Sequence, residues 1–217
     1  MKTIPLLLTL LILTGCMTAK TPLRVVCIGD SLTACGGPGG RYTDWLAAWM
    51  PEAEIINKGI GGNTLAQGRA RYQQDILDLN PNVVVIELGA NDFWRAKRPL
   101  DELAADLDYM VSAARHAGAQ VVIASCFGDA GNGDASPEFQ EDVHARYACG
   151  IAQVEQDVCI RYACFYVPNM QFDIKPVVDY PQYWGDDRHP NKAGNELVAR
   201  RIFAELEKAM AAARHGR

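Results

Sequence analysis

The chain has 217 residues and a formal net charge of −5 at pH 7, and 49% of its residues are hydrophobic and 22% charged. These values are typical of one soluble domain with a sizeable core, and they exclude a disordered chain, a collagen-like repeat and a polytopic membrane protein. An acidic chain without a lysine and arginine cluster has no electrostatic surface for nucleic acid, so we expect no such partner. The sequence indicates no oligomeric state.

The first residues have the pattern of an export signal. Lys2 precedes an almost wholly apolar run from Ile4 to Leu13, which is too short to span a bilayer stably. The residues after it, Leu-Thr-Gly-Cys at 13–16, resemble the lipobox of bacterial lipoproteins.

The lipobox resemblance implies a signal peptide over residues 1–15, a lipid on Cys16 and a tether over residues 16–22. Met17 in place of an acidic residue indicates the outer membrane, so we expect a lipid-anchored protein of the bacterial cell envelope that faces the periplasm. More than one acyl chain would make this membrane anchor stable. The alternative is an unmodified cysteine near an ordinary cleavage site.

Six cysteines follow, namely Cys27, Cys35, Cys126, Cys149, Cys159 and Cys164. Their even number allows disulfides in an oxidising compartment, and no connectivity follows from sequence. Cys27 lies in an apolar run and is expected to be a small core residue. Cys149, Cys159 and Cys164 have no paired Cys-x-x-Cys spacing or nearby histidine, so we expect core or disulfide residues there, with no metal and no cofactor.

Short β-rich runs alternate with longer amphipathic patterns along the rest of the chain. The expected strands are Leu23–Ile28, Glu54–Asn57, Val83–Leu88, Val121–Ser125 and a weaker one near Cys164–Val167. Two of these runs are continuously apolar, which is typical of parallel strands covered on both faces.

Helices are expected between these strands. Apolar residues from Leu100 to Ala114 follow the spacing of one buried helical stripe, and a second stripe runs from Leu65 to Leu79. Ser136-Pro137-Glu138 and Asn191 are expected to begin two more helices. The alternation predicts an α/β fold with a doubly wound parallel sheet over residues 23–210 and a tail over residues 211–217.

Four polar segments follow strands or precede the last helix, at residues 29–33, 57–64, 89–92 and 186–190. Each alone has an ordinary explanation as a cap or a turn. Because sites in such sheets lie at the carboxyl ends of the strands, we expect the four segments to meet at one edge. Together they contain what acyl transfer requires: a nucleophile, a base, a residue that orients the base, and oxyanion donors.

Ser31 offers the nucleophilic hydroxyl and His189 the base. Asp186, three residues before the histidine, can fold back to its other nitrogen, and we prefer it to the adjacent Asp187. The oxyanion donors are expected to be the backbone N–H groups of Ser31 and Gly62 and the side-chain amide of Asn91.

These segments resemble the motifs of the SGNH, or GDSL, hydrolases, and within them the bacterial periplasmic thioesterase, lysophospholipase and arylesterase group. The matching residues are Gly-Asp-Ser-Leu at 29–32, Gly-Gly-Asn-Thr at 61–64, Gly-Ala-Asn-Asp at 89–92 and Asp-Asp-Arg-His-Pro at 186–190. The resemblance covers nearly all of Val25 to Leu206. It implies a three-layer, flavodoxin-like fold and a metal-free acyl-enzyme mechanism with the same roles for Ser31, Gly62, Asn91, Asp186 and His189, and it gives Asp30 and Asp92 structural roles.

We therefore expect a serine esterase acting on a small acyl ester, namely a short-chain or aryl ester, a lysophospholipid or a thioester. One alternative is a carbohydrate O-deacetylase with the same machinery, and another is a catalytically silent surface lipoprotein that binds a glycan or lipid. Residues 35–40 are expected to form a flexible rim. Six aromatic residues either line a substrate pocket or pack in the ordinary way, namely Phe93, Trp94, Phe172, Tyr180, Tyr183 and Trp184.

Overall fold

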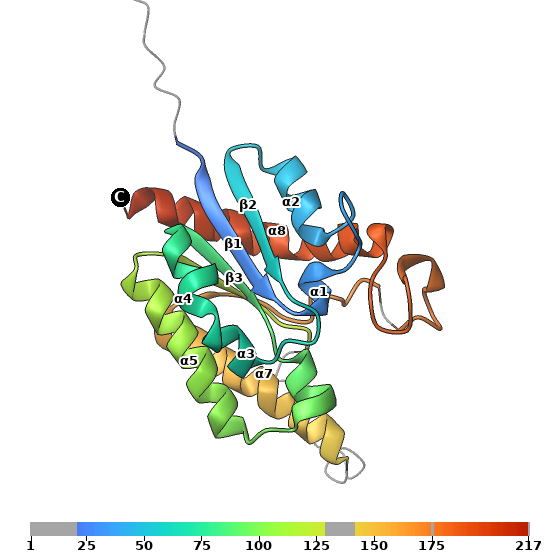
Figure 1. Cartoon of the computed structure of the whole chain (residues 1–217). Coiled ribbons are helices and arrows are strands. Elements are labelled where there is room, and N and C mark those ends of the chain that lie inside the picture. The colour runs from blue at the N-terminus through green and yellow to red at the C-terminus, as the bar shows by residue number, and fades with distance from the viewer. Residues whose placement is uncertain (1–20, 129–141, 175, 217) are drawn as a thin grey trace, which may run out of the picture.

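A computed structural model describes residues 21–128, 142–174 and 176–216 of the protein. The expected signal peptide, Cys16, most of the tether and the expected helix start at Ser136 lie outside these residues. A single sheet with helices on both faces makes up the fold (Figure 1).

The sheet has five parallel strands in the order β2-β1-β3-β4-β5. They are β1 (Leu23–Gly29), β2 (Ala53–Gly59), β3 (Val83–Glu87), β4 (Gln120–Ala124) and β5 (Phe165–Val167). All five expected strands are present, which confirms the predicted fold class. Because β2 and β3 lie on opposite sides of β1, the chain reverses direction across the sheet between β1 and β3, and ligands of such sheets bind at this switch point.

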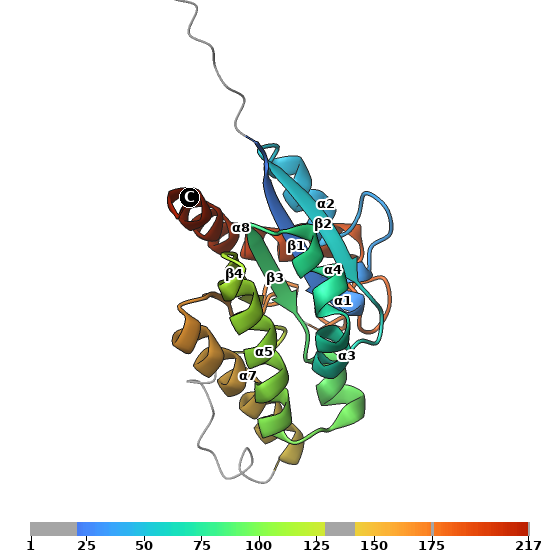
Figure 2. The same cartoon turned by 60° about the vertical axis from the view of Figure 1, so that its left-hand side comes forward.

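Helices cover both faces of the sheet, as the two views show (Figures 1 and 2). One face carries α2 (Tyr42–Trp49) and α8 (Lys192–His215), and the other carries α3 (Leu65–Ala70), α4 (Tyr72–Asp75), α5 (Leu100–His116) and α7 (Val143–Tyr162). The short helix α1 (Ser31–Ala34) follows β1 directly. Two 3-10 turns, at Leu77–Leu79 and Pro181–Tyr183, and one π-helical turn, at Asp92–Ala96, complete the described secondary structure.

Strand β1 is buried on both of its faces. Val25 and Cys27 pack with the residues beneath α2 and α8, whereas Val26 and Ile28 pack with those beneath α3, α4 and α5. All four side chains are 0% exposed. The apolar runs of the sequence therefore form a central parallel strand, and the expectation that Cys27 is a core residue is confirmed.

The predicted helical stripe from Leu65 to Leu79 is not one helix. It is divided into α3, α4 and a 3-10 turn, with Arg71 between α3 and α4 at a ψ of 2°. The Arg71 guanidinium donates to the carbonyl oxygens of Lys58 (2.8 Å) and Gly29 (3.1 Å), so this residue ties the helical segment to the strand ends.

Helix α8 begins as expected and ends later than expected. Asn191 caps it, with its side-chain oxygen accepting the N–H groups of Ala193 (2.9 Å) and Gly194 (3.0 Å). The helix continues to His215, through most of the expected tail over residues 211–217, because Ala213 packs against the core there. Within the described residues the six cysteines are thiols and form no disulfide.

Glu155 of α7 carries a buried carboxyl group. The Tyr166 hydroxyl donates a hydrogen bond to this carboxyl group at 3.3 Å, which partly offsets the cost of burying it. Burial raises the pKa of Glu155 from 4.5 to about 8, against the opposing effect of hydrogen bonds from Ser125 and Tyr166. The group is therefore protonated in the folded protein at neutral pH.

Replacing Glu155 by Gln should reduce the loss of stability on raising the pH. The carboxyl ionises near pH 4.5 in the unfolded chain and near pH 8 in the folded one, so its contribution is present below the lower value and is lost as the pH rises towards the upper. Melting temperatures across this window should fall less in Glu155→Gln, by several degrees at about 2–4 °C per kcal/mol.

The buried acids Asp30 and Glu87 also have raised pKa values, so some decline should remain in Glu155→Gln. The exposed Glu207 of α8 provides the control, and Glu207→Gln should melt with the wild-type pH dependence. If the melting temperatures of the wild type, Glu155→Gln and Glu207→Gln fall equally with rising pH, Glu155 is ionised in the folded state.

Candidate active site

Ser31 lies at the switch point of the sheet, at the first position of α1. The strand before it ends at Gly29, and the intervening Asp30 caps the helix by accepting the N–H of Leu32 at 2.8 Å. This cap begins α1 at Ser31 and places its side chain at the carboxyl edge of the sheet.

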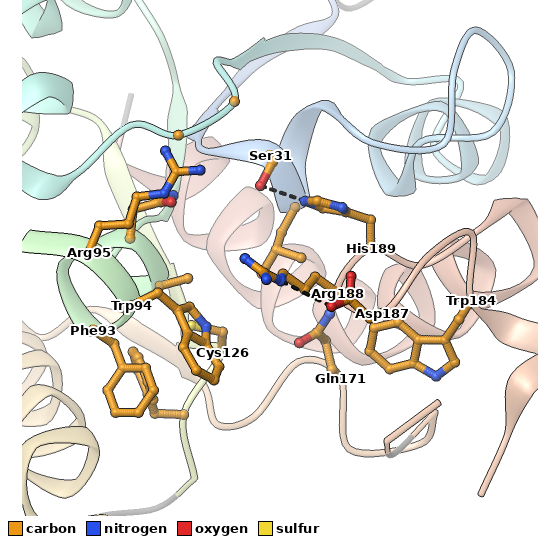
Figure 3. A pocket seen from close by; sticks show the side chains of 16 residues that line it. Ser31, Phe93, Trp94, Arg95, Cys126, Gln171, Trp184, Asp187, Arg188 and His189 are labelled. Carbon is orange, nitrogen blue, oxygen red and sulfur yellow. Dashed lines mark hydrogen bonds and ion pairs between the residues drawn. The ribbon is translucent and has the colours of Figure 1, made fainter. Parts of the chain in front are cut away.

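Ser31, His189 and Asp186 form one hydrogen-bonded chain. His189 Nε2 is 3.0 Å from Ser31 Oγ (Figure 3), and His189 Nδ1 is 2.8 Å from Asp186 Oδ2. The Asp186 carboxylate also accepts the backbone N–H groups of Arg188 (2.8 Å) and His189 (2.9 Å), which closes the turn between them. The bond to the His189 ring, followed by the Arg188 N–H, lowers the pKa of Asp186 to about 2, so the group is a carboxylate at neutral pH.

The adjacent carboxylate Asp187 has a different environment. Its side chain is exposed and forms an ion pair with Arg188 at 3.4 Å. The structure thus places Asp186, the residue preferred from sequence, on the imidazole of His189, and Asp187 on the cavity wall (Figure 3).

Two backbone N–H groups beside Ser31 are available to a ligand. Within the described residues, neither Ser31 nor Gly62 donates its N–H to an acceptor. Gly62 has a φ of +83°, a conformation that favours glycine over residues with a Cβ. Both residues line the same cavity, so their N–H groups can serve as oxyanion donors.

The side chain of Asn91 already uses both of its amide hydrogens. Its Nδ2 donates to Asp30 Oδ2 at 2.8 Å and to the carbonyl oxygen of Asn63 at 3.1 Å. Asn91 lines the cavity, but a substrate oxygen can take a hydrogen bond from it only by sharing or displacing one of these bonds. The longer bond, to Asn63, is the weaker of the two.

Two buried acids lie beneath the nucleophile. Glu87 at the end of β3 accepts the Thr33 hydroxyl at 2.8 Å and the Asp30 N–H at 3.3 Å, while its Oε1 has no hydrogen-bond partner. Burial, and then the neighbouring charge of Asp30, raises the pKa of Glu87 well above its ordinary value. Burial also raises the pKa of Asp30, to about 6, against the opposing bonds from Leu32 and Asn91. Glu87 is therefore the neutral partner at neutral pH.

Sequence reasoning identified Asp30 as a structural residue but did not single out Glu87 or Asn195. An acidic residue inside the apolar run Val83–Leu88 was the available signal for Glu87. Asn195 is 0% exposed and donates to the carbonyl oxygens of Cys35 (3.2 Å) and Pro190 (3.3 Å). It thereby joins the loop after the nucleophile to the turn that carries His189, and no sequence pattern indicated this contact.

A cavity of about 490 Å³ opens over Ser31 and His189. Among the six aromatic residues considered from sequence, three line it, namely Phe93, Trp94 and Trp184. The others have different surroundings: the Phe172 ring packs under the Arg201 guanidinium at 5.1 Å, and the rings of Tyr180 and Tyr183 lie 6.2 Å apart. The six aromatic residues thus divide into three that line the cavity and three that do not.

The cavity contains no metal-binding arrangement that the structure can identify. Within the described part of the chain, no group of three or more His, Cys, Asp and Glu residues is placed to hold an ion. None of the helices described is long and apolar enough to cross a membrane.

Cys35 and Gly36, in the expected rim, border a second and more open hollow beside His189.

A three-layer α/β fold with a parallel sheet, and with hydrogen-bonded Ser, His and Asp side chains at the switch point of that sheet, defines a hydrolase that acts by nucleophilic attack. A model of the GDSL-like lipase/acylhydrolase family matches residues 27–197. The chain belongs to this family, and it is a hydrolase of ester bonds.

Several curated proteins are similar to the chain over most of its length. It is 28% identical over 210 residues to an acetylxylan esterase of Geobacillus stearothermophilus, covering 84% of this chain and 93% of that protein. It is 27% identical over 212 residues to an arylesterase of Vibrio mimicus, covering 91% and 96%. An uncharacterized lipoprotein of Bacillus subtilis, YqeF, is 28% identical over 141 residues, covering 58% and 57%.

The solved structure of the Geobacillus acetylxylan esterase, Axe2, has the same fold. It superposes with a TM-score of 0.67 and 26% identity, over 86% of this chain and 96% of that one. The three-layer fold expected from the motif resemblance is therefore confirmed.

Replacing Asp186 by Asn should reduce turnover by about 10³- to 10⁴-fold, because an amide at this position favours the wrong tautomer of His189. Asp187→Asn is the matched control and should stay close to wild type, since Asp187 contacts Arg188 and not the imidazole. Measurement of kcat on an activated ester compares the two. A larger loss in Asp187→Asn would transfer the orienting role to that residue.

Replacing Asn91 by Ala should lower kcat by roughly a hundred- to a thousandfold, the typical cost of one oxyanion donor. It should also lower the melting temperature, because the buried Asp30 carboxylate would lose a hydrogen-bond donor. Steady-state kinetics and thermal melting measure the two effects separately. A change in KM alone would mean that Asn91 binds the substrate without stabilising the transition state.

Proposed function

We propose that this protein is a serine esterase with Ser31 as nucleophile, His189 as general base and Asp186 as the residue that orients the base. The observation that carries the proposal is the unbroken hydrogen-bonded chain from Ser31 Oγ through both nitrogens of His189 to Asp186. A binding protein has no need of this arrangement, which argues against a catalytically silent lipoprotein. Solved structures of the acetylxylan esterase include catalytic mutants in which a serine or a histidine is replaced by alanine.

Acylation begins when Ser31 Oγ attacks the ester carbonyl and His189 Nε2 takes the hydroxyl proton. The Asp186 carboxylate accepts the hydrogen bond of the Nδ1–H and stabilises the imidazolium that forms. The oxyanion is held by the N–H groups of Ser31 and Gly62, and Asn91 contributes by redirecting one amide hydrogen. His189 then gives its proton to the leaving alcohol, and an acyl group remains on Ser31.

Deacylation repeats these steps with water as the nucleophile. His189 Nε2 removes a proton from the water, which attacks the acyl carbonyl, and the same donors hold the second oxyanion. Collapse of this intermediate returns the proton to Ser31 Oγ and releases the carboxylic acid. The chain's own residues supply every group that this sequence of steps uses.

A small acyl ester is the substrate class that the cavity favours. A volume of about 490 Å³ with aromatic walls suits a short-chain or aryl ester, a thioester or the ester end of a lysophospholipid. A carbohydrate O-deacetylase is the second candidate, since Trp94 is 66% exposed at the cavity and a relative is an acetylxylan esterase. Nitrophenyl esters of increasing length, acyl-CoA, lysophospholipid and acetylated xylan distinguish these substrates.

Replacing Ser31 by Ala should abolish ester hydrolysis and leave the fold intact, because the hydroxyl takes part in the chemistry and its loss leaves only a small gap at the surface. A fluorophosphonate reagent should label the wild-type protein and leave Ser31→Ala unlabelled. An unchanged melting temperature serves as the control for folding. Persistent labelling of Ser31→Ala would place the nucleophile elsewhere.

We propose further that residues 1–15 are a signal peptide and that a lipid on Cys16 anchors the domain to the cell envelope, at the outer membrane facing the periplasm. The similarity to the lipoprotein YqeF supports this proposal. A tether over residues 16–22 can extend at most about 25 Å. It joins the amino end of β1, whereas Ser31 follows the carboxyl end, so the catalytic groups would face away from the anchored end.

Cells that produce the full-length protein and a Cys16→Ser form test the anchor. The full-length protein should partition into the detergent phase, and Cys16→Ser should stay in the aqueous phase, because a diacylglyceryl group and an added acyl chain bind a membrane stably. Equal recovery of both forms in the soluble fraction would exclude lipidation at Cys16.

A further inference from the structure

Arg95 is an unpaired cation in the wall of the catalytic cavity. It belongs to the helical turn after β3, and no residue in the described part of the chain forms an ion pair or a hydrogen bond with its guanidinium. The side chain lies beside the proposed oxyanion donor Gly62, with Nη1 3.1 Å from where a Cβ of that residue would be. The positive charge of Arg95 is therefore available to a ligand in the cavity.

Arg188 brings a second guanidinium from the opposite wall. It immediately precedes His189, and Figure 3 shows its side chain extending into the cavity between His189 and Trp94. Its one ion pair, with Asp187, is long at 3.4 Å, and both partners are largely exposed. The side chains that line the cavity thus include two arginines and one acid, Asp187, although the whole chain carries a net charge of −5.

Gln171 adds a donor that lacks an acceptor. Its Nε2 is buried and has no hydrogen-bond partner, and its side chain lines the cavity near Arg188 and Asp187 (Figure 3). A buried N–H group without an acceptor is costly, and a small rotation of the Gln171 side chain would bring it to a ligand oxygen in the cavity. This observation is independent of the two arginines and points to an oxygen-rich group in the same space.

We propose that Arg95, Arg188 and Gln171 form an anion subsite, so that the preferred substrate is an ester that also carries a phosphate or carboxylate group near the ester bond. This inference rests on the proposed esterase function. Guanidinium groups bind phosphate and carboxylate oxygens through charge-assisted hydrogen bonds, and a neutral sugar ester offers no such charge. The subsite selects among small esters and leaves the chemistry at Ser31 unchanged.

Matched pairs of substrates test the subsite on both sides of the ester bond. On the alcohol side the pair is 1-butanoylglycerol and 1-butanoylglycerol 3-phosphate, and on the acyl side it is 4-nitrophenyl hexanoate and mono-4-nitrophenyl adipate. The measured quantity is the ratio of kcat/KM for the anionic ester to that for the neutral one. The wild-type ratio should exceed one for at least one pair, and the pair that shows it locates the anionic group. Added salt should lower that ratio.

Arg95→Gln and Arg188→Gln should each lower the ratio about tenfold, the loss expected for one charge-assisted contact. Gln171→Leu should lower it by a smaller factor. The matched control is Arg200→Gln on α8, which removes an equally exposed arginine outside the cavity and should keep the wild-type ratio.

Three outcomes separate the possible failures. If the wild-type protein hydrolyses neither member of either pair, the esterase proposal fails. If it hydrolyses both members of each pair with ratios near or below one, the anion subsite alone is excluded. If Arg95→Gln lowers kcat for anionic and neutral esters by the same factor, Arg95 acts on the oxyanion and the subsite is again excluded.

Discussion

Gly29 at the end of β1 is paired in register with Gly59 at the end of β2 and with Glu87 at the end of β3. The three strands therefore end at one level, and the chain leaves all of them within a few residues of each other. Ser31, Gly62 and Asn91 follow these ends by two, three and four residues. Because backbone hydrogen bonds hold the three strands together, and β1 and β3 are buried on both faces, this register limits how far the three groups can move apart. The register thereby positions Ser31, to which His189 is hydrogen-bonded from the turn before α8.

This convergence is accompanied by buried carboxyl groups, with Asp30 and Glu87 beneath the nucleophile and Glu155 of α7 near Glu87. Asp30, Glu87 and Glu155 are each at most 2% exposed, and none of them has a paired lysine or arginine in the described structure. Burial raises the pKa of each carboxyl group and so disfavours its charged form, while hydrogen bonds from backbone, hydroxyl and amide groups stabilise it. Asp30 is the most constrained, since it caps α1 and also holds the amide of Asn91. One carboxyl group thus positions both the nucleophile and a proposed oxyanion donor.

The cavity above these buried acids carries positive charge instead. Arg95 and Arg188 bring positive charge to the space above Ser31, and the exposed ring of Trp94 and the indole of Trp184 provide apolar surface beside them. The two layers have different physical roles: the buried acids hold the machinery in place, and the cavity residues decide which esters reach it. Substitutions in the second layer can therefore change selectivity while the fold is retained.

The sequence by itself determined the fold class and the candidate chemistry. Continuous apolar runs of β-branched residues such as Val83 to Ile86 are typical of buried parallel strands, and the polar residues that follow the strands must then meet at one edge. Local spacing was also sufficient to prefer Asp186 over Asp187, because a three-residue turn is a short-range structure. Asn191 could be predicted as a helix cap for the same reason, because a cap contacts N–H groups only two and three residues further along the chain.

Only the tertiary structure decided what depends on contacts between distant segments. The break of the helical stripe at Arg71 follows from bonds to Lys58 and Gly29, and the commitment of both Asn91 hydrogens follows from Asp30 and Asn63. The lack of a partner for the Arg95 guanidinium and for Gln171 Nε2 within the described residues is likewise a property of the folded cavity. A sequence pattern records periodicity and neighbours along the chain, whereas burial, desolvation and the absence of a partner arise only when remote segments are packed together.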